Sequence, residues 1–197
     1  MFYRLAKFIC YLFFRYICHW QVKGQGLFPP EGPVIVVANH RSLWDPVAVG
    51  VAVPRQVRFM AKEELFRIPG LGFLLRALGA YPVKRGKSDR AALQASLDIL
   101  RQGQVVGLFP EGTRVRGREL GRFYGGAALL ALKTGAPLVP VALKGTDRVF
   151  RQGWFRPFYV AIGPPLFPRR SGTYTPQEVE ELTEQSRQAI AKLLEQI

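Results

Sequence analysis

Cysteine is scarce in this chain of 197 residues, which contains only Cys10 and Cys18. On one helix, eight positions separate these thiols by roughly 12 Å, too far for a disulfide. A disulfide-stapled fold is therefore excluded, and the composition fits a reducing compartment. A chain of this length can bury a full core without staples, and its 48% of hydrophobic residues excludes intrinsic disorder.

Acidic residues are also few: the chain has 14 Asp and Glu and 28 Lys and Arg, which gives a net charge of +14. So basic a chain is expected to meet an anionic partner: nucleic acid, a membrane surface or a phosphorylated substrate. The charge is uneven along the chain. Residues 1–172 carry a net charge of +17, and residues 173–197 carry a net charge of −3.

Long uncharged runs are absent from the aromatic N-terminal segment. The longest, Phe8–Phe14, is far shorter than the ~20 residues of a membrane span. A signal peptide is also not expected, since Arg15 follows this run and no small-residue cleavage site appears.

On a helical wheel of residues 1–20, Arg4, Lys7 and Arg15 fall within an arc of about 80°, and apolar side chains fill most of the rest. This pattern predicts an amphipathic helix that lies in the membrane interface, with Trp20 at the headgroup level. The alternative is a helix that docks on the core of the protein itself or on a partner.

The last 25 residues form a second distinct segment. Thr175, Pro176 and Glu178 match a capped helix start, and apolar residues then recur on one side. We therefore predict three parts: an interfacial helix over 1–20, an α/β domain over 21–172, and an amphipathic helix packed on that domain over 173–197.

Between these ends, strand patterns alternate with helix patterns. Predicted strands are Pro33–Ala38, Val57–Ala61, Ala80–Lys84, Val105–Phe109, Leu138–Leu143 and Phe158–Ile162. Predicted helices are Pro46–Val53, Leu71–Leu78, Ser88–Arg101 and Phe123–Thr134. The fold class expected is α/β, with a mixed, largely parallel central sheet flanked by helices.

The heptad Asn39–Asp45 directly follows the first of these strands. Ligands of α/β sheets bind beyond the carboxyl ends of strands, so His40 is well placed for chemistry. Imidazole is a natural general base at neutral pH, and Asp45 could accept a hydrogen bond from its other nitrogen. Two alternatives stay open: a structural histidine, and an Asp45 that, with Pro46, only starts a helix.

Neither a nucleophile nor a metal cluster accompanies His40 in the sequence. Ser42 lacks the Gly-x-Ser-x-Gly elbow, and both cysteines belong to the N-terminal segment. Metal-ligand spacings, a phosphate-binding Gly-x-x-x-x-Gly-Lys-Ser/Thr loop and a Gly-x-Gly-x-x-Gly turn are all missing. We therefore expect His40 to activate a hydroxyl group of a substrate.

Two other strand ends carry groups that suit a phosphate. In the run Phe109–Arg114, Gly112 permits close approach to the backbone, Thr113 can donate a hydrogen bond, and Arg114 offers a planar fork. Arg85 leaves the strand predicted over 80–84. The alternatives are an ordinary solvated basic loop and a surface arginine.

Taken together, these motifs resemble those of the glycerolipid acyltransferases. The resemblance rests on the order and spacing of Asn39-His40-x4-Asp45, Gly79…Val83-x-Arg85, Phe109-Pro-Glu-Gly-Thr-Arg114 and Val139-Pro-Val-Ala142. The segment Ala61–Phe66 is similar as well. Pro82 departs from the phenylalanine that many members carry, and the chain is short for the family.

The resemblance implies that His40, oriented by Asp45, takes the proton of the sn-2 hydroxyl of 1-acyl-sn-glycerol-3-phosphate. The oxygen then attacks an acyl thioester, giving phosphatidic acid without an acyl-enzyme. Acyl-CoA or acyl-carrier protein is the implied co-substrate, with no cofactor and no metal. The implied acceptor-site residues are Arg85, Glu111, Gly112, Thr113 and Arg114, with Lys62 as a further phosphate candidate and Pro140 as the shaping residue of the fourth motif.

The partners expected are a membrane lipid substrate, a membrane surface contacted through residues 1–20, and possibly acyl-carrier protein, but no nucleic acid. The location expected is the cytoplasmic face of the cell membrane, peripheral or monotopic. One alternative keeps the chemistry and changes the acceptor to glycerol-3-phosphate or another lysophospholipid. A more distant alternative is a basic, non-catalytic protein that binds membranes or nucleic acid.

Overall fold

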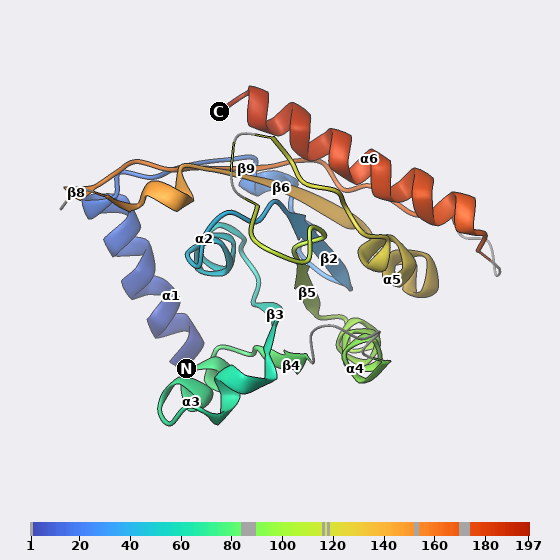
Figure 1. Cartoon of the computed structure of the whole chain (residues 1–197), viewed down its shortest axis with the longest axis horizontal. Coiled ribbons are helices and arrows are strands. Elements are labelled where there is room, and N and C mark those ends of the chain that lie inside the picture. Colours follow the sequence, from blue (N-terminus) through green and yellow to red (C-terminus); the bar gives the residue numbers. More distant parts are fainter. Residues whose placement is uncertain (1, 84–89, 116, 118, 152–153, 170–173) are drawn as a thin grey trace.

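A computed structural model describes residues 2–83, 90–115, 117, 119–151, 154–169 and 174–197 (Figure 1). Seven strands form one sheet in the order β1-β9-β6-β2-β5-β3-β4. All neighbouring strands of this sheet pair in parallel except β6 and β9, which are antiparallel. The predicted mixed, largely parallel sheet is therefore confirmed.

The strands of this sheet are short, and the innermost ones are rich in valine. Their bounds are β1 (Gln21–Lys23), β2 (Val34–Ala38), β3 (Val57–Lys62), β4 (Tyr81–Val83), β5 (Val105–Leu108), β6 (Leu138–Lys144) and β9 (Tyr159–Ile162). A separate antiparallel hairpin consists of β7 (Phe150–Arg151) and β8 (Trp154–Phe155). The described part of the chain gives β1, β7 and β8 in addition to the strands predicted.

Helices cover both faces of the sheet. They are α1 (Phe2–Leu12), α2 (Asp45–Ala52), α3 (Leu71–Ala77), α4 (Arg90–Arg101), α5 (Gly126–Thr134) and α6 (Pro176–Glu195). Short turns of other helix types are the π-helix Phe13–Ile17 and the 3-10 helices Gln25–Leu27, Glu63–Arg67 and Thr146–Arg148. Helix α6 starts with the predicted capping box between Thr175 and Glu178.

Strand β2 divides the core into two layers. Val34, Val36 and Ala38 point into a cluster that includes α2, the π-helical turn and β9. Ile35 and Val37 point into a second cluster built with α4, α5 and α6. Because successive side chains of a strand face opposite sides, a fully apolar β2 serves both layers, as its continuous apolar sequence predicts.

The N-terminal segment lies partly on the body of the protein. The Tyr3 hydroxyl donates to the Gly50 carbonyl at 3.3 Å, and the Lys7 amine donates to the Val53 carbonyl. Lys7 thus turns toward α2 instead of lining a solvated basic strip with Arg4 and Arg15, and burial lowers the pKa of its amine. Phe14 and Trp20 are buried in the first core layer, so the prediction that Trp20 lies at the headgroup level is wrong: its ring packs against Phe14 and Phe158.

The rest of this segment is open to solvent. Exposed apolar side chains of α1 and the π-helical turn are Phe2, Leu5, Phe8, Ile9, Tyr11, Tyr16 and Ile17. Among the helices of the described residues, none combines the length and apolar character needed to cross a bilayer.

Helix α5 begins at Gly126 and not at Phe123 as predicted. The Tyr124 amide donates to the Pro110 carbonyl at 2.8 Å, and Phe123 is buried in the second core layer. These contacts hold Phe123 and Tyr124 beside the turn after β5. Helical hydrogen bonding begins with the carbonyl of Gly125, the N-cap, which accepts the Leu129 amide at 2.9 Å.

Candidate active site

The carboxyl ends of β2 and β5 lie side by side at one edge of the sheet. Their register pairs Val37 with Leu108, so Asn39 and His40 leave β2 next to Phe109 and Glu111 beyond β5. Strand β3 pairs with β5 as far as Phe59 and then continues beside β4 to Lys62. The first and third sequence motifs, 71 residues apart at His40 and Glu111, therefore meet at this edge.

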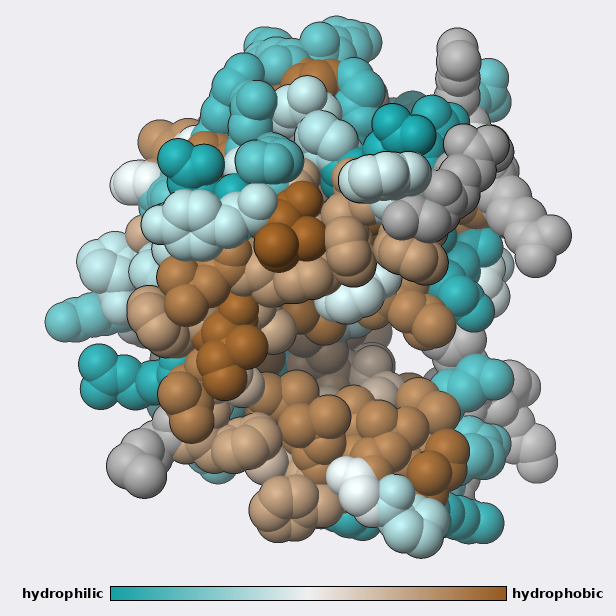
Figure 2. Space-filling model, turned by 90° about the vertical axis from the view of Figure 1, so that its left-hand side faces the viewer, coloured by the Kyte–Doolittle hydropathy of each residue, from teal (hydrophilic) through white to brown (hydrophobic). Residues whose placement is uncertain are grey.

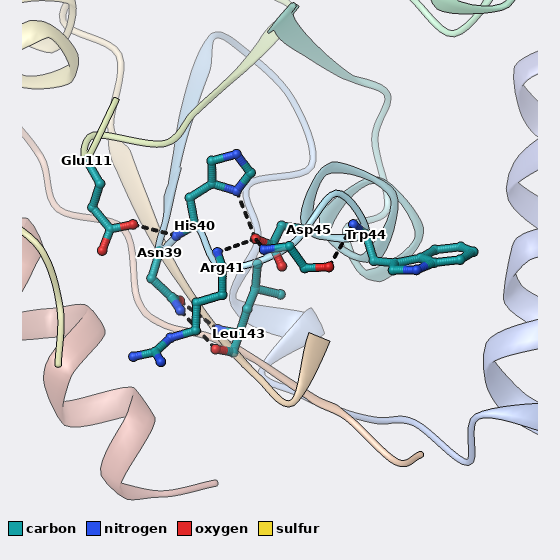
Figure 3. A network of polar contacts seen from close by, with 8 residues as sticks. Asn39, His40, Arg41, Trp44, Asp45, Glu111 and Leu143 are labelled. Atoms are coloured by element: carbon teal, nitrogen blue, oxygen red, sulfur yellow. Dashed lines mark hydrogen bonds and ion pairs between the residues drawn. The ribbon is translucent and has the colours of Figure 1, made fainter. Parts of the chain in front are cut away.

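Asn39 anchors the end of β2 to the neighbouring strand β6. Its side-chain amide donates to the Leu143 carbonyl at 2.9 Å, and the Leu143 amide donates to its side-chain oxygen at 2.8 Å. Asn39 is fully buried, so this pair of bonds is shielded from water. The clamp fixes the backbone immediately before His40 (Figure 3).

His40 and Asp45 form the hydrogen bond expected from their spacing. The imidazole Nδ1 lies 2.8 Å from Asp45 Oδ2, and the ring points back over the loop toward this carboxylate (Figure 3). Asp45 is completely buried and His40 nearly so. A carboxylate acceptor favours the tautomer with the proton on Nδ1, which leaves a lone pair on Nε2.

Asp45 does more than begin a helix. It occupies the first turn of α2, where a negative charge is favoured, but the N-cap is Trp44 and has no side-chain capping bond. Asp45 Oδ2 instead accepts the backbone amides of Arg41 and Ser42 at 2.6 and 2.7 Å. The carboxylate thus folds the loop 41–44 around itself and holds the ring of His40 at the same time.

Two aromatic rings support the imidazole. The Phe109 ring stacks on His40 with centroids 4.1 Å apart and planes inclined by 19°, and Phe59 stacks on Phe109 at 5.5 Å. A Cβ at Gly107 would lie 2.3 Å from the Phe59 ring, so glycine is required there. This stack was not predicted from the sequence, although Phe109 opens the third motif.

Glu111 binds backbone with both of its carboxylate oxygens. Oε2 accepts the His40 amide at 2.6 Å, and Oε1 accepts the Gly121 amide at 3.0 Å. The side chain is 6% exposed. Glu111 therefore ties the end of β2 to the loop after the third motif.

Arg41 ties the same loop from the other side. Its guanidinium donates to the Gly117 carbonyl and to the Glu119 carbonyl, the latter at 3.3 Å. The Val115 amide adds a bond to the His40 carbonyl at 2.9 Å. The loop after the third motif is thus held close to the histidine by side chains and by backbone.

The remaining residues implied by the resemblance differ in their surroundings. Gly112, Thr113 and Arg114 follow β5 in an exposed turn, with Gly112 at a φ of 70° that favours glycine. Lys62 is exposed at the end of β3. Arg85 lies outside the described residues. Pro140 is buried in β6, opposite Val37, and its carbonyl accepts the Gly163 amide at 2.9 Å.

The other nucleophiles considered in the sequence lie in unsuitable places. Cys10 and Cys18 belong to the N-terminal segment, and burial raises the pKa of both thiols, which lowers the amount of thiolate. The Ser42 hydroxyl accepts the Trp44 amide at 3.2 Å within the loop. Across the described ranges, no group of three or more metal-ligating side chains comes together.

A groove of about 1160 Å³ lies between residues 120–125 and the first half of α6. Its lining includes Arg122, Glu180 and Glu184, but neither His40 nor Asp45. The groove therefore adjoins the far side of the loop that Glu111 holds, and it does not contain the histidine.

Comparison with known proteins gives a consistent result. A family model described as Acyltransferase matches residues 19–144, and this range contains all four sequence motifs. Two bacterial 1-acyl-sn-glycerol-3-phosphate acyltransferases are each 32% identical to the chain. The one from Borreliella burgdorferi aligns over 89% of this chain and 72% of its own length, and the one from Bacillus subtilis over 70% and 69%.

A chloroplastic enzyme of the same description from Brassica napus is 34% identical over 62% of this chain, but the match spans only 36% of the plant protein. The fold is also similar to a solved structure. The crystal structure of the 1-acyl-sn-glycerophosphate acyltransferase PlsC from Thermotoga maritima superposes with a TM-score of 0.80 and 26% identity. This match covers 98% of the present chain and 78% of that one.

Proposed function

The chain belongs to the Acyltransferase family, and from this membership we propose that it acylates 1-acyl-sn-glycerol-3-phosphate at the sn-2 hydroxyl to give phosphatidic acid. The acyl donor in this proposal is a thioester, acyl-CoA or acyl-carrier protein. The observation that carries the proposal is the 2.8 Å contact between His40 Nδ1 and Asp45 Oδ2 at the carboxyl edge of the sheet.

In the proposed mechanism, His40 Nε2 takes the proton of the sn-2 hydroxyl as its oxygen attacks the thioester carbonyl carbon. Asp45 stabilises the imidazolium through Nδ1. The tetrahedral intermediate then collapses: the carbon–sulfur bond breaks, and the departing thiolate receives the proton from Nε2. The acyl group passes directly to the lipid, in keeping with thiols that are remote and poorly ionised.

The proposed phosphate site is the turn after β5. Gly112 and Thr113 offer backbone and hydroxyl donors, and Arg114 offers a bidentate fork. Lys62 ends the next strand on the same edge and adds a second cation. Arg85, outside the described residues, is proposed for the same phosphate on the resemblance alone. Glu111, whose oxygens both hold backbone amides, is assigned to positioning His40.

The lipid acceptor requires a membrane surface, and α1 is the proposed contact. Its exposed apolar side chains form one side of the helix, and Figure 2 shows hydrophobic residues over the middle and lower part of this side of the molecule. Such a helix suits the boundary between headgroups and acyl chains. The protein is accordingly proposed to be peripheral or monotopic at the cytoplasmic face of the cell membrane, where acyl-carrier protein could reach it.

The proposed reaction is tested by acyl transfer on vesicles that contain 1-acyl-sn-glycerol-3-phosphate, with acyl-CoA and acyl-carrier protein supplied separately. Replacement of His40 by Ala should lower kcat at least ~10²-fold, because a general base contributes that much. The matched control is His19→Asn, since His19 is the other of the two histidines, is exposed, and has a φ of 47° that asparagine tolerates.

Equal rates for the wild type and His40→Ala would remove His40 from the mechanism. Absence of phosphatidic acid with both donors would reject this acceptor, and the same assay with glycerol-3-phosphate or another lysophospholipid would then identify the one used.

A further inference from the structure

The hairpin β7–β8 carries an exposed group of aromatic side chains. Phe150, Trp154 and Phe155 have exposed fractions of 60%, 72% and 40%. The Arg156 amide donates to the Val149 carbonyl at 2.9 Å and closes the base of the hairpin. Large apolar side chains that gather on a surface mark a place where another apolar phase or partner makes contact.

A series of ring contacts joins this hairpin to the N-terminal segment and to the active-site loop. The Phe150 and Phe155 rings lie 5.1 Å apart, and Phe155 meets Phe13 edge-on at 5.1 Å. Phe13 stacks on Trp44 at 6.0 Å. Trp44 immediately precedes Asp45, so the series ends one residue from the partner of His40.

The same residues lie on one side of the molecule. In Figure 1, β8 is at the same side as α1, and Figure 2 shows that side with hydrophobic residues over much of its surface. Leu43 and Trp44 add exposed fractions of 75% and 37% beside the histidine. The apolar side of α1, the hairpin and the loop 43–44 thus lie on the same side of the molecule. Together they are called the aromatic face below.

The distribution of acidic residues sets this face apart. All 14 Asp and Glu of the chain lie within residues 31–147 and 178–197. Residues 1–30 and 148–177, which supply α1 and the hairpin, contain 9 Lys and Arg and no acidic residue. Among the described cations, Arg15 and Arg156 are exposed, and in the sequence they lie two residues after Phe13 and directly after Phe155. A face with this charge matches an anionic surface.

We propose that the hairpin β7–β8 and the loop Leu43–Trp44 are a second membrane-contact site, which enters the interface of an anionic phospholipid bilayer together with α1. This inference rests on the proposed function, because it assumes a lipid acceptor. Trp154 and Trp44 would lie at the headgroup level, where tryptophan is favoured. The acceptor then reaches His40 sideways along the loop 43–44 while its acyl chain stays in the bilayer.

A bilayer explains these observations better than a protein partner does. Protein interfaces pair charges of both signs around an apolar centre, whereas this face has cations alone along two separate segments. The helix α1, the hairpin and the loop 43–44 are also apolar on the same side of the molecule. A membrane surface can contact all three at once.

The three tryptophans of the chain provide a direct test, because Trp20 is buried and Trp44 and Trp154 belong to the aromatic face. Two single-tryptophan chains are compared on vesicles of phosphatidylglycerol and phosphatidylcholine that carry brominated acyl chains. One chain keeps Trp154 (Trp20→Phe and Trp44→Phe), and the other keeps Trp20. Bromine should quench the fluorescence of Trp154 strongly and that of Trp20 hardly at all. Equal, weak quenching of both would overturn the proposal.

Binding to the same vesicles, unbrominated, is then measured by sedimentation for the full chain with Trp154→Ser and Phe155→Ser. Partitioning should fall about tenfold or more, because two large apolar side chains no longer enter the interface. The matched control is Phe167→Ser. Phe167 is 74% exposed, and its neighbour Leu166 pairs with Leu138, the first residue of β6, whereas the hairpin follows the last residue of that strand.

A fall of the same size in Phe167→Ser, or no fall in the hairpin variant, would overturn the proposal. So would sedimentation analysis that shows a wild-type dimer and a monomeric hairpin variant, since the face would then be a protein interface. The vesicles contain neither acceptor nor donor, so binding is independent of the proposed reaction. A chain that binds through the hairpin but makes no phosphatidic acid would refute the proposed reaction alone.

Discussion

At the scale of single residues, the site is organised by polar side chains that form hydrogen bonds with backbone groups of other segments. Asn39 binds both polar groups of Leu143, Asp45 accepts two amides besides the imidazole, and Glu111 accepts two amides that lie 81 positions apart. Buried polar groups that lose a partner are costly, so each of these side chains fixes a backbone position more firmly than apolar packing could. The histidine is thereby presented at one place and in one tautomer.

Glu111→Gln is expected to lower kcat by about 10- to 100-fold, because a glutamine can accept an amide with only one of its two terminal atoms, and His40 or Gly121 then loses its acceptor. The same change should leave the KM for the lipid acceptor within about threefold, since the carboxylate does not face the substrate. Steady-state kinetics on vesicles measure both constants.

Glu119→Gln is the control for this change, because the exposed Glu119 belongs to the same loop and carries the same charge. A large rise in the KM of Glu111→Gln with an unchanged kcat would instead place Glu111 in the acceptor site, as the resemblance implied.

The sequence allowed the contact between His40 and Asp45 to be predicted because both residues lie in one short loop. The partners of Asn39 and Glu111 were out of reach, since they are backbone amides and carbonyls that carry no side-chain signal in the sequence. The same holds for the ring stack, in which Phe59 and Gly107 come from neighbouring strands. Residues that act through the backbone of distant segments become visible only when the sheet is assembled.

At the scale of elements, helix α2 is fixed at both of its ends. Its first turn contains Asp45, and the carbonyls of its last turn accept hydrogen bonds from Tyr3, Lys7 and Gln25. The last carbonyls of a helix have no intrahelical partner, so donors from another segment satisfy them. A cation there is also attracted to the negative end of the helix dipole. The N-terminal segment thus stabilises the helix that positions the carboxylate.

Lys7→Met is expected to destabilise the fold by about 1 kcal/mol, because the Val53 carbonyl loses its donor while the apolar stem is kept. For a chain of this size, that loss corresponds to a fall in Tm of about 2–4 °C. Thermal unfolding followed by circular dichroism measures the shift. Arg4→Met removes the same charge from an exposed position of α1 and should leave Tm nearly unchanged; an equal shift in both variants would contradict the capping role.

Element type was predictable where a pattern extends over several residues. The apolar runs of β2 and β6 and the capping box of α6 gave strands and a helix in the expected places. The two- and three-residue strands β1, β7 and β8 have no period to detect, and they form because neighbouring backbone offers hydrogen bonds. The late start of α5 also depends on distant backbone, because a bond from Tyr124 to Pro110 and the burial of Phe123 hold these residues beside the turn after β5.

At the scale of the whole molecule, charge and apolar surface are distributed together. The two segments without acidic residues contain the exposed aromatic side chains of α1 and of the hairpin, whereas α6 carries all five acidic residues of the last 25 positions. A molecule with this asymmetry has a preferred orientation at an anionic surface, because its positive side is attracted and its acidic helix is not.

Vesicle binding should therefore weaken with salt. Raising the ionic strength from about 0.1 M to about 1 M shortens the Debye length from about 10 Å to about 3 Å and should lower binding to phosphatidylglycerol vesicles about tenfold. Sedimentation with vesicles measures the effect, and pure phosphatidylcholine vesicles are the control, with little dependence on salt expected. Salt-independent binding to the anionic vesicles would show that apolar contacts alone hold the protein.

The clamp between Asn39 and Leu143 also has a consequence for protein synthesis. The two residues lie 104 positions apart, and Glu111 lies 71 positions after His40. A ribosome that adds about 5–20 residues per second completes Leu143 roughly 5–20 s after Asn39. Later in that interval the aromatic N-terminal segment has left the ribosome, but the histidine still lacks the strand that holds it. The growing chain can therefore meet a membrane before it has a working active site.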